Sequence, residues 1–481
     1  MAVSFFFYDL ETSGFNPRSQ RIMQFAGQRT DPSLNLVGEP VNFLIKLSDD
    51  ILPDADAVLI TGITPQMTIA DGLTEAEFLR EFETTVATPG TVFLGFNTIR
   101  FDDEFMRNLH YRNFYDPYEW QWQDDRSKWD LLDVVRMTRA LRPGGIQWPF
   151  DIHGKPTNRL ELLTGLNKLD HAHAHDALSD VIATIEVARL IRNKQIKLFE
   201  YLFSMRDKKK IAALVETGDP FVYTSGQYPG EYEKTTVAVQ VCPHPDRSGT
   251  AFVYDLRHDP AQYKDMTAEQ LAEEWRWKKD SDEPRLPVKK LQYNHCPAIA
   301  PLSVLDDTSQ QRLKIDMKVI KKHLAALQSM KDLAARLCAA DELLESKRQT
   351  SLVATDKDVD EQLYDGFFDN GDKQAMRVVR AAQPQELGDL GLHFKDPRLE
   401  ALLPLYKARN YPKLLTSEER EVWEQHRMRK LMGGGAHSAL AKYFEHLQTV
   451  MARDGLTGEQ TYIIEELRLY AESIMPEVDG A

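Results

Sequence analysis

The sequence predicts an α/β domain on a mixed β-sheet, followed by a β-containing domain and an all-helical domain. Three observations carry this prediction: apolar runs separated by turn residues fill 4–46, helix and strand patterns alternate over 74–192, and nearly every segment beyond about 360 has helical periodicity. A chain of 481 residues is too long for one core and fits about three domains. We place them at 1–197, 198–350 and 351–481.

The first domain opens as a strand-rich meander, which extends to about residue 100. We expect strands at 4–10, 22–30, 36–46 and 91–97, with helices at 74–86, 102–111, 129–141, 158–167 and 176–192. The alternation of helix and strand after the meander gives the sheet its mixed character.

The second and third domains differ in their pattern of expected strands and helices. Short β-like runs at 221–224, 235–241, 250–256 and 288–293 are interrupted by helical patterns at 267–279 and 308–330. The polar stretch 346–360 is the best candidate linker. Helices are then expected at 416–432, 436–453 and 458–474, with the triple glycine 433–435 as a break between two of them.

Composition indicates an ordinary soluble protein of a reducing compartment. The apolar fraction is 42%, the charged fraction is 28%, and the three cysteines form no C-x-x-C pair. We find neither a signal peptide pattern nor an apolar stretch of membrane-spanning length, so we expect a cytoplasmic protein. A net charge of −15 excludes a uniformly basic surface but not a local basic groove for nucleic acid.

Two carboxylates end the first apolar run. On an extended strand Phe5, Phe7, Asp9 and Glu11 share one face, because side chains alternate. Two neighbouring acids at the end of a buried strand resist joint ionisation. A divalent cation would remove that cost.

Two further acidic positions follow. Asp102 comes just after the strand 91–97, at the sheet edge where α/β sites form. His175 precedes Asp180 by five residues, and the two can share a site if His175 lies in the loop before a helix capped by Asp176.

Each acid also has an ordinary explanation. Asp9 and Glu11 are compatible with a simple strand end, Asp102 with a helix cap, and Asp180 with an exposed polar face. His171, His173 and His175 are also compatible with a metal-binding tract, although no fourth ligand is evident. The functional interpretation rests on the conjunction D-x-E, N-x-x-x-F-D and H-x-x-x-x-D, in this order and on these elements.

That conjunction resembles the DEDD exonuclease superfamily in its histidine variant. The segments 58–65, 112–118, 129–134, 360–368 and 406–412 are similar to the bacterial exonuclease I family of exodeoxyribonucleases, so the resemblance spans nearly the whole chain. It implies a ribonuclease-H-like domain over 1–197, an SH3-like domain over 198–350 and a helical extension, arranged as a C shape around a central groove.

The resemblance also implies a function. The chain would degrade single-stranded DNA processively from its 3′ end to deoxynucleoside 5′-monophosphates, in DNA repair and recombination. Asp9, Glu11, Asp102 and Asp180 would be ligands of two Mg²⁺ ions, for which Mn²⁺ can substitute. His175 would be the general base, since its ordinary pKa of about 6.5 lets it accept a proton at neutral pH.

Residues 107–129 interleave cations with aromatic side chains, a composition suited to phosphates and bases. Arg107, Tyr118 and Trp122 are our candidates there, although half of these aromatic residues are compatible with core positions. By resemblance, Glu11 and Arg159 also contact substrate. Arg136 and Arg142 are further candidates, and each is equally compatible with a surface ion pair.

The family's usual partner is single-strand-binding protein, whose acidic C-terminal tail needs a small basic and apolar pocket. Arg142 and Tyr201 are the residues we expect in it. We expect a monomer with no membrane association. Two alternatives remain at this stage: an exoribonuclease of the same superfamily, and a non-catalytic strand-binding module on a nuclease scaffold.

Overall fold

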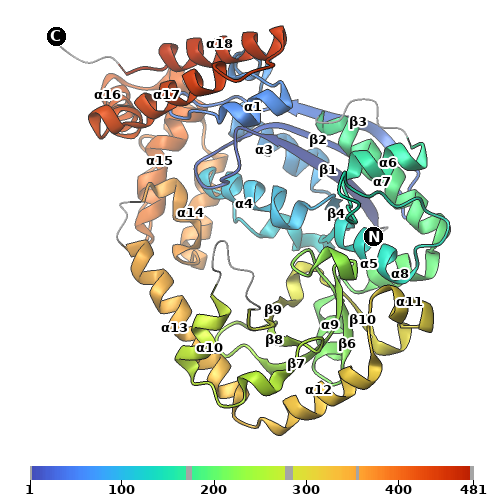
Figure 1. The fold of residues 1–481 in the computed structure, drawn as a ribbon. Helices are drawn as coiled ribbons and strands as arrows, with labels where there is room; N and C mark the ends of the chain where they lie inside the picture. The colour runs from blue at the N-terminus through green and yellow to red at the C-terminus, as the bar shows by residue number, and fades with distance from the viewer. Residues whose placement is uncertain (1–2, 170–175, 277–284, 354–356, 477–481) are drawn as a thin grey trace.

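The structure is a computed structural model that describes residues 3–169, 176–276, 285–353 and 357–476 (Figure 1). A five-stranded mixed sheet of order β3-β2-β1-β4-β5 is the centre of the N-terminal α/β unit. β1 pairs antiparallel with β2 and parallel with β4, and β4 pairs parallel with β5. The strands are β1 (Ser4–Thr12), β2 (Ile22–Thr30), β3 (Leu36–Leu44), β4 (Thr91–Gly95) and β5 (Ser127–Asp130).

Helices cover both faces of this sheet. Its helices are α1 (Ala55–Thr61), α2 (Pro65–Asp71), α3 (Glu75–Glu81), α4 (Asp102–Arg112), α5 (Leu131–Leu141), α6 (Leu160–Asn167), α7 (Ala177–Lys194) and α8 (Ile196–Ser204). Phe5 and Phe7 of β1 belong to the core formed with α5 and α7. Phe6, Tyr8 and Leu10 belong to the opposite core, formed with α3 and α4. The strict alternation confirms that β1 is buried on both faces.

The middle unit is built on a second, antiparallel sheet of order β10-β6-β7-β8-β9. Its strands are β6 (Phe221–Thr224), β7 (Thr235–Pro243), β8 (Thr250–Asp255), β9 (Val288–Gln292) and β10 (Ala298–Pro301), of which β10 is absent from the sequence-based expectation. Its helices are α9 (Lys208–Val215), α10 (Ala268–Trp275), α11 (Asp307–Arg312), α12 (Met317–Ser329) and α13 (Leu333–Val353).

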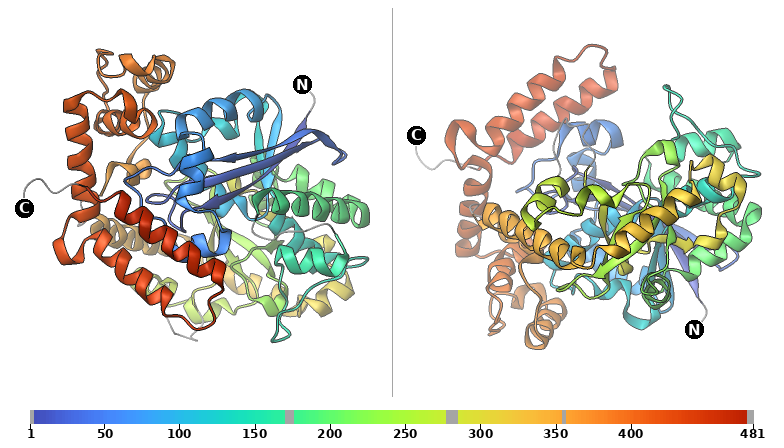
Figure 2. Two further views of the ribbon diagram at one scale, coloured as in Figure 1. Left: turned by 90° about the horizontal axis from the view of Figure 1, so that it is seen from above. Right: turned by 60° about the horizontal axis from the view of Figure 1, so that its bottom comes forward.

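The C-terminal unit is helical, as expected. It contains α14 (Asn370–Ala381), α15 (Pro397–Asn410), α16 (Ser417–Arg427), α17 (Ala439–Met451) and α18 (Gly458–Ser473). The triple glycine does break the chain before α17, with Gly434 and Gly435 in the left-handed region. In Figure 1 α13 leads from the middle unit to this one, and the three units surround a central space. Seen from above, α17 and α18 lie against the N-terminal unit (Figure 2).

Three sequence-based expectations are wrong. The stretch before α3 is not strand-rich throughout, because α1 and α2 occupy it, each capped by a side chain (Asp54 and Thr64). The helix expected from 129 is preceded by the short strand β5. The proposed linker 346–360 is largely helical, because α13 continues to Val353.

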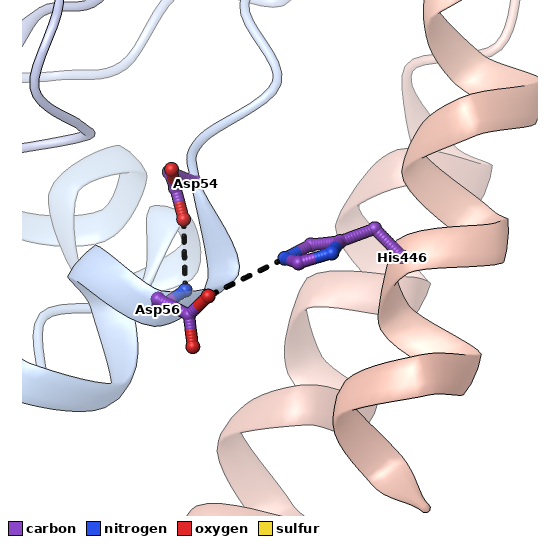
Figure 3. A group of neighbouring side chains, drawn as sticks. All are labelled: Asp54, Asp56 and His446. Carbon is purple, nitrogen blue, oxygen red and sulfur yellow. Dashed lines mark hydrogen bonds and ion pairs between the residues drawn. The ribbon is translucent and has the colours of Figure 1, made fainter. Parts of the chain in front are cut away.

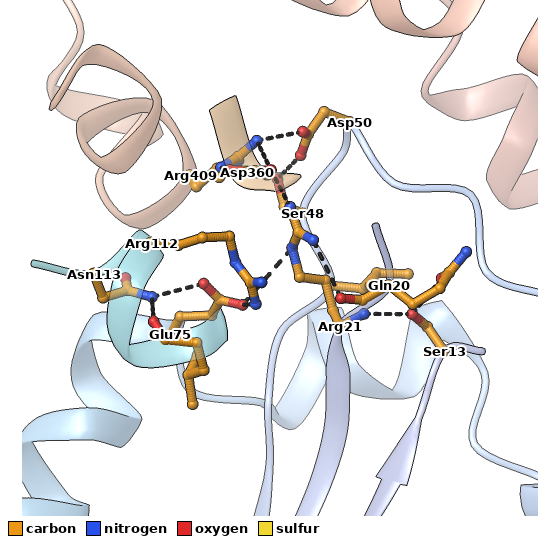
Figure 4. Close-up of polar contacts among 12 residues, drawn as sticks. Ser13, Gln20, Arg21, Ser48, Asp50, Glu75, Arg112, Asn113, Asp360 and Arg409 are labelled. Atoms are coloured by element: carbon orange, nitrogen blue, oxygen red, sulfur yellow. Dashed lines mark hydrogen bonds and ion pairs between the residues drawn. The ribbon is translucent and has the colours of Figure 1, made fainter. Parts of the chain in front are cut away.

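A buried cluster of charged side chains, here called the interdomain network, joins the first unit to the last (Figure 4). Arg409 of α15 donates to Asp50 at 2.7 Å and to Asp360 at 2.8 and 2.9 Å. Arg21, just before β2, donates to Asp360 at 2.6 Å, and Lys430 donates to Asp50 at 2.6 Å. Both carboxylates are almost fully buried, so their partners are needed to compensate lost hydration.

Among the residues that the structure describes, no helix is both long enough and apolar enough to cross a membrane.

Candidate active site

β1 brings the first two carboxylates to the carboxyl end of the central strand. Asp9 lies opposite Ala26 of β2, and Asp9 and Glu11 continue the face begun by Phe5 and Phe7. That face is covered by α7, which packs on β1 and β2. The alternation read from the sequence therefore places both acids beneath the first turns of this helix.

Asp180 completes a tight acidic cluster. The Asp176 side chain caps α7 by accepting from the Ser179 amide at 2.9 Å, which places Asp180 in the first turn of the helix. Carboxylate oxygens of Asp9, Glu11 and Asp180 all lie within 4.8 Å of one another. These acids thus come together as expected from the motif order.

Asp102 lies beside this cluster but is not one of its three members. It begins α4, is buried, and accepts a hydrogen bond from the Leu10 amide at 3.1 Å. That bond joins the start of α4 to β1 at Leu10, which lies between Asp9 and Glu11 in the strand. The structure therefore places Asp102 next to Asp9.

The electrostatics of the site favour protons or a cation. Burial and the charges of Asp180 and Asp176 raise the pKa of Asp9 well above its usual value. Burial, then Asp9, raises the pKa of Glu11 to about 9, and burial and Asp9 likewise raise the pKa of Asp102. Carboxylate oxygens are the ligands that Mg²⁺ and Mn²⁺ prefer, and a bound divalent cation would let all of these groups ionise. The donor set fits such a cation.

A cavity of about 500 Å³ opens beside the carboxylates, and we call it the catalytic cavity. Asp9 and Asp180 line it, together with the cations Arg136, Arg159 and Lys234. Arg159 lies 3.9 Å from Glu161 with 74% of its side chain exposed, whereas Arg136 pairs with Asp133 at 2.6 Å. Lys234 comes from the middle unit, and an isolated lysine in a turn gives no signal in the sequence.

A second cavity of about 920 Å³, here called the groove, is lined by all three units. Arg107, Tyr118 and Trp122, which the sequence suggests as substrate contacts, line it. Trp122 is 59% exposed, while Arg107 is mostly buried, bonded to Glu104 and stacked on Tyr118. The groove therefore combines cations with open aromatic faces.

The sequence reasoning missed two aromatic residues of the groove, Tyr364 and Phe367, which the C-terminal unit contributes. Phe367 is 88% exposed, and its ring centroid lies 6.2 Å from that of Tyr118. The expectation that some aromatic residues of 107–129 belong to the core is confirmed. The buried ones are Tyr111, Phe114, Trp120 and Trp129.

The two residues expected in a partner pocket lie elsewhere, at the junction of the first and middle units. Arg142 donates to the Val304 carbonyl at 3.0 Å and lies 3.6 Å from Asp306. The Tyr201 hydroxyl donates to the Ile299 carbonyl at 3.2 Å. Arg142 lines neither the catalytic cavity nor the groove, as far as the described residues show.

His175, like His171 and His173, lies outside the described residues. In the sequence His175 directly precedes Asp176. A site shared by His175 and Asp180 requires a helix that is capped by Asp176, and the structure confirms this cap.

A second group with metal-ligand chemistry consists of Asp54, Asp56 and His446 (Figure 3). Asp54 caps α1 through the Asp56 amide, and His446 of α17 lies 3.6 Å from Asp56. Arg453 binds both oxygens of Asp56, so an arginine already balances the charge of that carboxylate. We interpret it as a contact between α1 and the last unit.

Comparison with known proteins covers nearly the whole chain. Residues 6–188 match an exonuclease family, 206–340 match the exonuclease I SH3-like domain, and 357–474 match the exonuclease I C-terminal domain. Exodeoxyribonuclease I of Escherichia coli is 38% identical over 476 residues, which covers 98% of either chain.

Two solved structures are similar throughout. The E. coli exonuclease I complex with a dA16 oligonucleotide has a TM-score of 0.90 at 37% identity and covers 98% of this chain and 100% of that one. A structure of single-strand-binding protein with exonuclease I and an inhibitor has a TM-score of 0.89 at 37% identity, and covers 99% and 100%.

Proposed function

Because the chain belongs to the exonuclease I family, we propose that it degrades single-stranded DNA from the 3′ end to deoxynucleoside 5′-monophosphates. The observation that carries the proposal is the half-buried acidic cluster beside a cavity lined by cations, together with a groove lined by aromatic side chains. The exoribonuclease alternative loses support, because the DNA-degrading relative matches all three units.

We assign Asp9, Glu11, Asp102 and Asp180 as the residues that hold divalent cations, with Mg²⁺ as the proposed ion and Mn²⁺ as its substitute. Bound there, the two ions would supply an activated water and charge stabilisation for the departing 3′-oxygen. Leu10 fixes Asp102 through its amide, and the helix cap at Asp176 fixes Asp180. We also propose Glu11, near the end of β1, as a contact to the substrate.

His175 is the proposed general base, which takes a proton from the attacking water on a ring nitrogen. Its position in the sequence, directly before the α7 cap and five residues before Asp180, supports this role. Arg159, Arg136 and Lys234 supply positive charge for the phosphates that surround the cleaved bond.

The strand itself would run through the groove, with bases stacked on Trp122, Phe367, Tyr118 and Tyr364 and phosphates near Arg107. All three units line the groove, and such enclosure slows dissociation between steps and supports processive degradation. We propose that the protein acts as a monomer.

The proposal is tested by digestion of end-labelled single-stranded DNA, duplex DNA and RNA of the same sequence with Mg²⁺. We expect rapid release of mononucleotides from the 3′ end of single-stranded DNA alone, and no release with EDTA. Preferential RNA digestion would instead establish the exoribonuclease. Strand binding without cleavage at any metal concentration would establish a binding module.

Trp122→Ala should weaken binding of single-stranded DNA by about 1–3 kcal/mol, because one base loses its stacking surface. Fluorescence anisotropy with Ca²⁺ in place of Mg²⁺ measures this affinity without cleavage. Tyr462→Ala, which removes an equally exposed ring on α18, is the matched control and should bind as the wild type does. Equal affinities for all three proteins would remove Trp122 from the substrate path.

Arg159→Ala should weaken the use of all base sequences alike, because a phosphate contact carries no base information. The slope of log affinity against log salt concentration should become shallower by roughly 0.7 for one lost phosphate contact on a single strand. Affinities of homopolymeric oligonucleotides at several salt concentrations test both points. A loss confined to certain bases would contradict the assignment.

For the partner, we propose that the acidic tail of single-strand-binding protein docks at the junction of the first and middle units, where Arg142 and Tyr201 lie. A labelled tail peptide should bind, and its affinity should fall as salt rises, since exposed charges are screened beyond about 10 Å at 0.1 M salt. Arg142→Ala should weaken binding without changing cleavage of short DNA. Binding unaffected by this change would place the tail elsewhere.

A further inference from the structure

Asp130, the last residue of β5, makes more hydrogen bonds than its local position requires. It is 9% exposed, and its Oδ1 accepts from the amides of Asn97 at 3.1 Å and Leu132 at 2.9 Å. Its Oδ2 accepts from the Ile99 amide at 3.2 Å. The bond to Leu132 caps α5, but the other two reach across to a different segment.

That segment is the connection from β4 to Asp102. It turns sharply there, with Asn97 in the left-handed region at a φ of 76°. A Cβ at Gly95 would lie 2.4 Å from the Tyr8 carbonyl oxygen, so the chain leaves β4 in close contact with β1. Asp102 follows Ile99 by three residues, and the path of this loop sets where its carboxylate lies.

The same face of β5 also contacts Asp103, the residue that follows Asp102 in the chain. The Lys128 ammonium group lies 3.3 Å from Oδ2 of Asp103, and the Tyr8 hydroxyl donates to Asp103 at 2.5 Å. Residues 128 and 130 share a face because strand side chains alternate. β5 thus contacts the chain both before and after Asp102.

We propose that Asp130 is a positioning residue that fixes the β4–α4 loop and thereby holds Asp102 in place for divalent cation binding. The inference rests on the proposed function, in which Asp102 is a ligand. The competing explanation is that Asp130 is only the N-cap of α5. A cap needs the Leu132 bond alone, and serine supplies that bond as well as aspartate does.

Two substitutions separate these explanations. Asp130→Ser keeps a capping oxygen near Leu132 but is too short to reach the Asn97 and Ile99 amides. Asp130→Asn keeps the size and one acceptor oxygen, but an amide group cannot accept from both sides. Asp316→Ser is the matched control: Asp316 caps α12 through the Lys318 amide at 2.8 Å, is exposed, and lies in the middle unit.

The readout is Mn²⁺ affinity by calorimetric titration, well below each protein's unfolding temperature, with Mg²⁺-dependent cleavage measured in parallel. We expect both Asp130 variants to bind Mn²⁺ roughly 10- to 100-fold more weakly, the usual effect of losing a residue that supports a ligand. Cleavage should recover in part at high metal concentration, and Asp316→Ser should match the wild type.

The proposal would be overturned if the folded Asp130 variants bound Mn²⁺ as tightly as the wild type, whatever their unfolding temperature. Asp130 would then be only the N-cap of α5. If Asp130→Ser does not fold, Asp130→Asn, which retains the packing, decides. Failure of the wild type to bind Mn²⁺ or to cleave would overturn the proposed function itself, and this inference with it.

Discussion

Asp9→Asn is expected to abolish nucleotide release at every Mg²⁺ concentration while leaving the protein folded. The half-buried carboxylate lies in one cluster with those of Glu11 and Asp180, and the neutral amide that replaces it cannot balance the charge of a divalent cation. The rate of nucleotide release should fall by more than about 100-fold, which is the upper end of the effect of residues that only support a metal ligand. Single-turnover digestion of end-labelled DNA measures it.

Stability gives an independent readout of the same substitution. Burial and neighbouring acids disfavour the charged form of Asp9, as its raised pKa indicates, so the native state without metal carries an electrostatic cost. Asp9→Asn removes that cost, and its unfolding temperature in EDTA should equal or exceed that of the wild type. Metal should then raise the unfolding temperature of the wild type more than that of the variant.

Glu186→Ala is the control, because Glu186 lies further along α7 and pairs with Arg189. It should leave cleavage unchanged. Wild-type rates for Asp9→Asn in excess Mg²⁺ or Mn²⁺ would remove Asp9 from the ligand set, and unfolding of the variant in EDTA would show that the acid has a structural role.

The acidic cluster could be predicted because its residues lie on regular elements close to their ends. Alternation along β1 places Asp9 and Glu11 on one face, and the capping residue Asp176 fixes where α7 begins and hence where Asp180 lies. Local rules of this kind depend on a few residues at a time, so they can be read from the chain.

Other parts depend on contacts between distant segments. β5 has four residues and is followed directly by α5, so in the sequence its hydrophobic pattern cannot be separated from that of the helix. The sequence therefore gives no sign that β5 supports Asp102. Likewise α13 reaches Val353 through a polar stretch, and the composition of this stretch is that of a linker. Lys234, Tyr364 and Phe367 join the catalytic cavity and the groove only through the packing of whole units.

The interdomain network is the clearest such case, since Asp50 and Asp360 share Arg409 although they lie far apart in the chain. Burial alone would raise the pKa of each carboxyl, but Arg409 and its neighbouring cations outweigh burial and hold both pKa values below their usual range. Both acids are therefore charged in the native protein at neutral pH.

Arg409→Met should lower the free energy of unfolding at pH 7 by about 3–5 kcal/mol, because two buried carboxylates lose a shared partner. Arg468→Met is the control: Arg468 is an exposed α18 residue paired with Glu465, and such a pair contributes at most about 1 kcal/mol. Urea unfolding followed by tryptophan fluorescence measures both variants.

The pH dependence tests the cause. A carboxyl whose native pKa is lowered stabilises the fold fully above its unfolded pKa of about 3.9, and this contribution disappears as pH falls towards the native pKa. The difference in unfolding free energy between the wild type and Arg409→Met should therefore be constant from pH 7 to about 5 and shrink below about 4. An equal difference at pH 7 and pH 3 would show that Arg409 stabilises by packing on Trp423, over whose ring it lies at 5.8 Å, and not by pairing with Asp50 and Asp360.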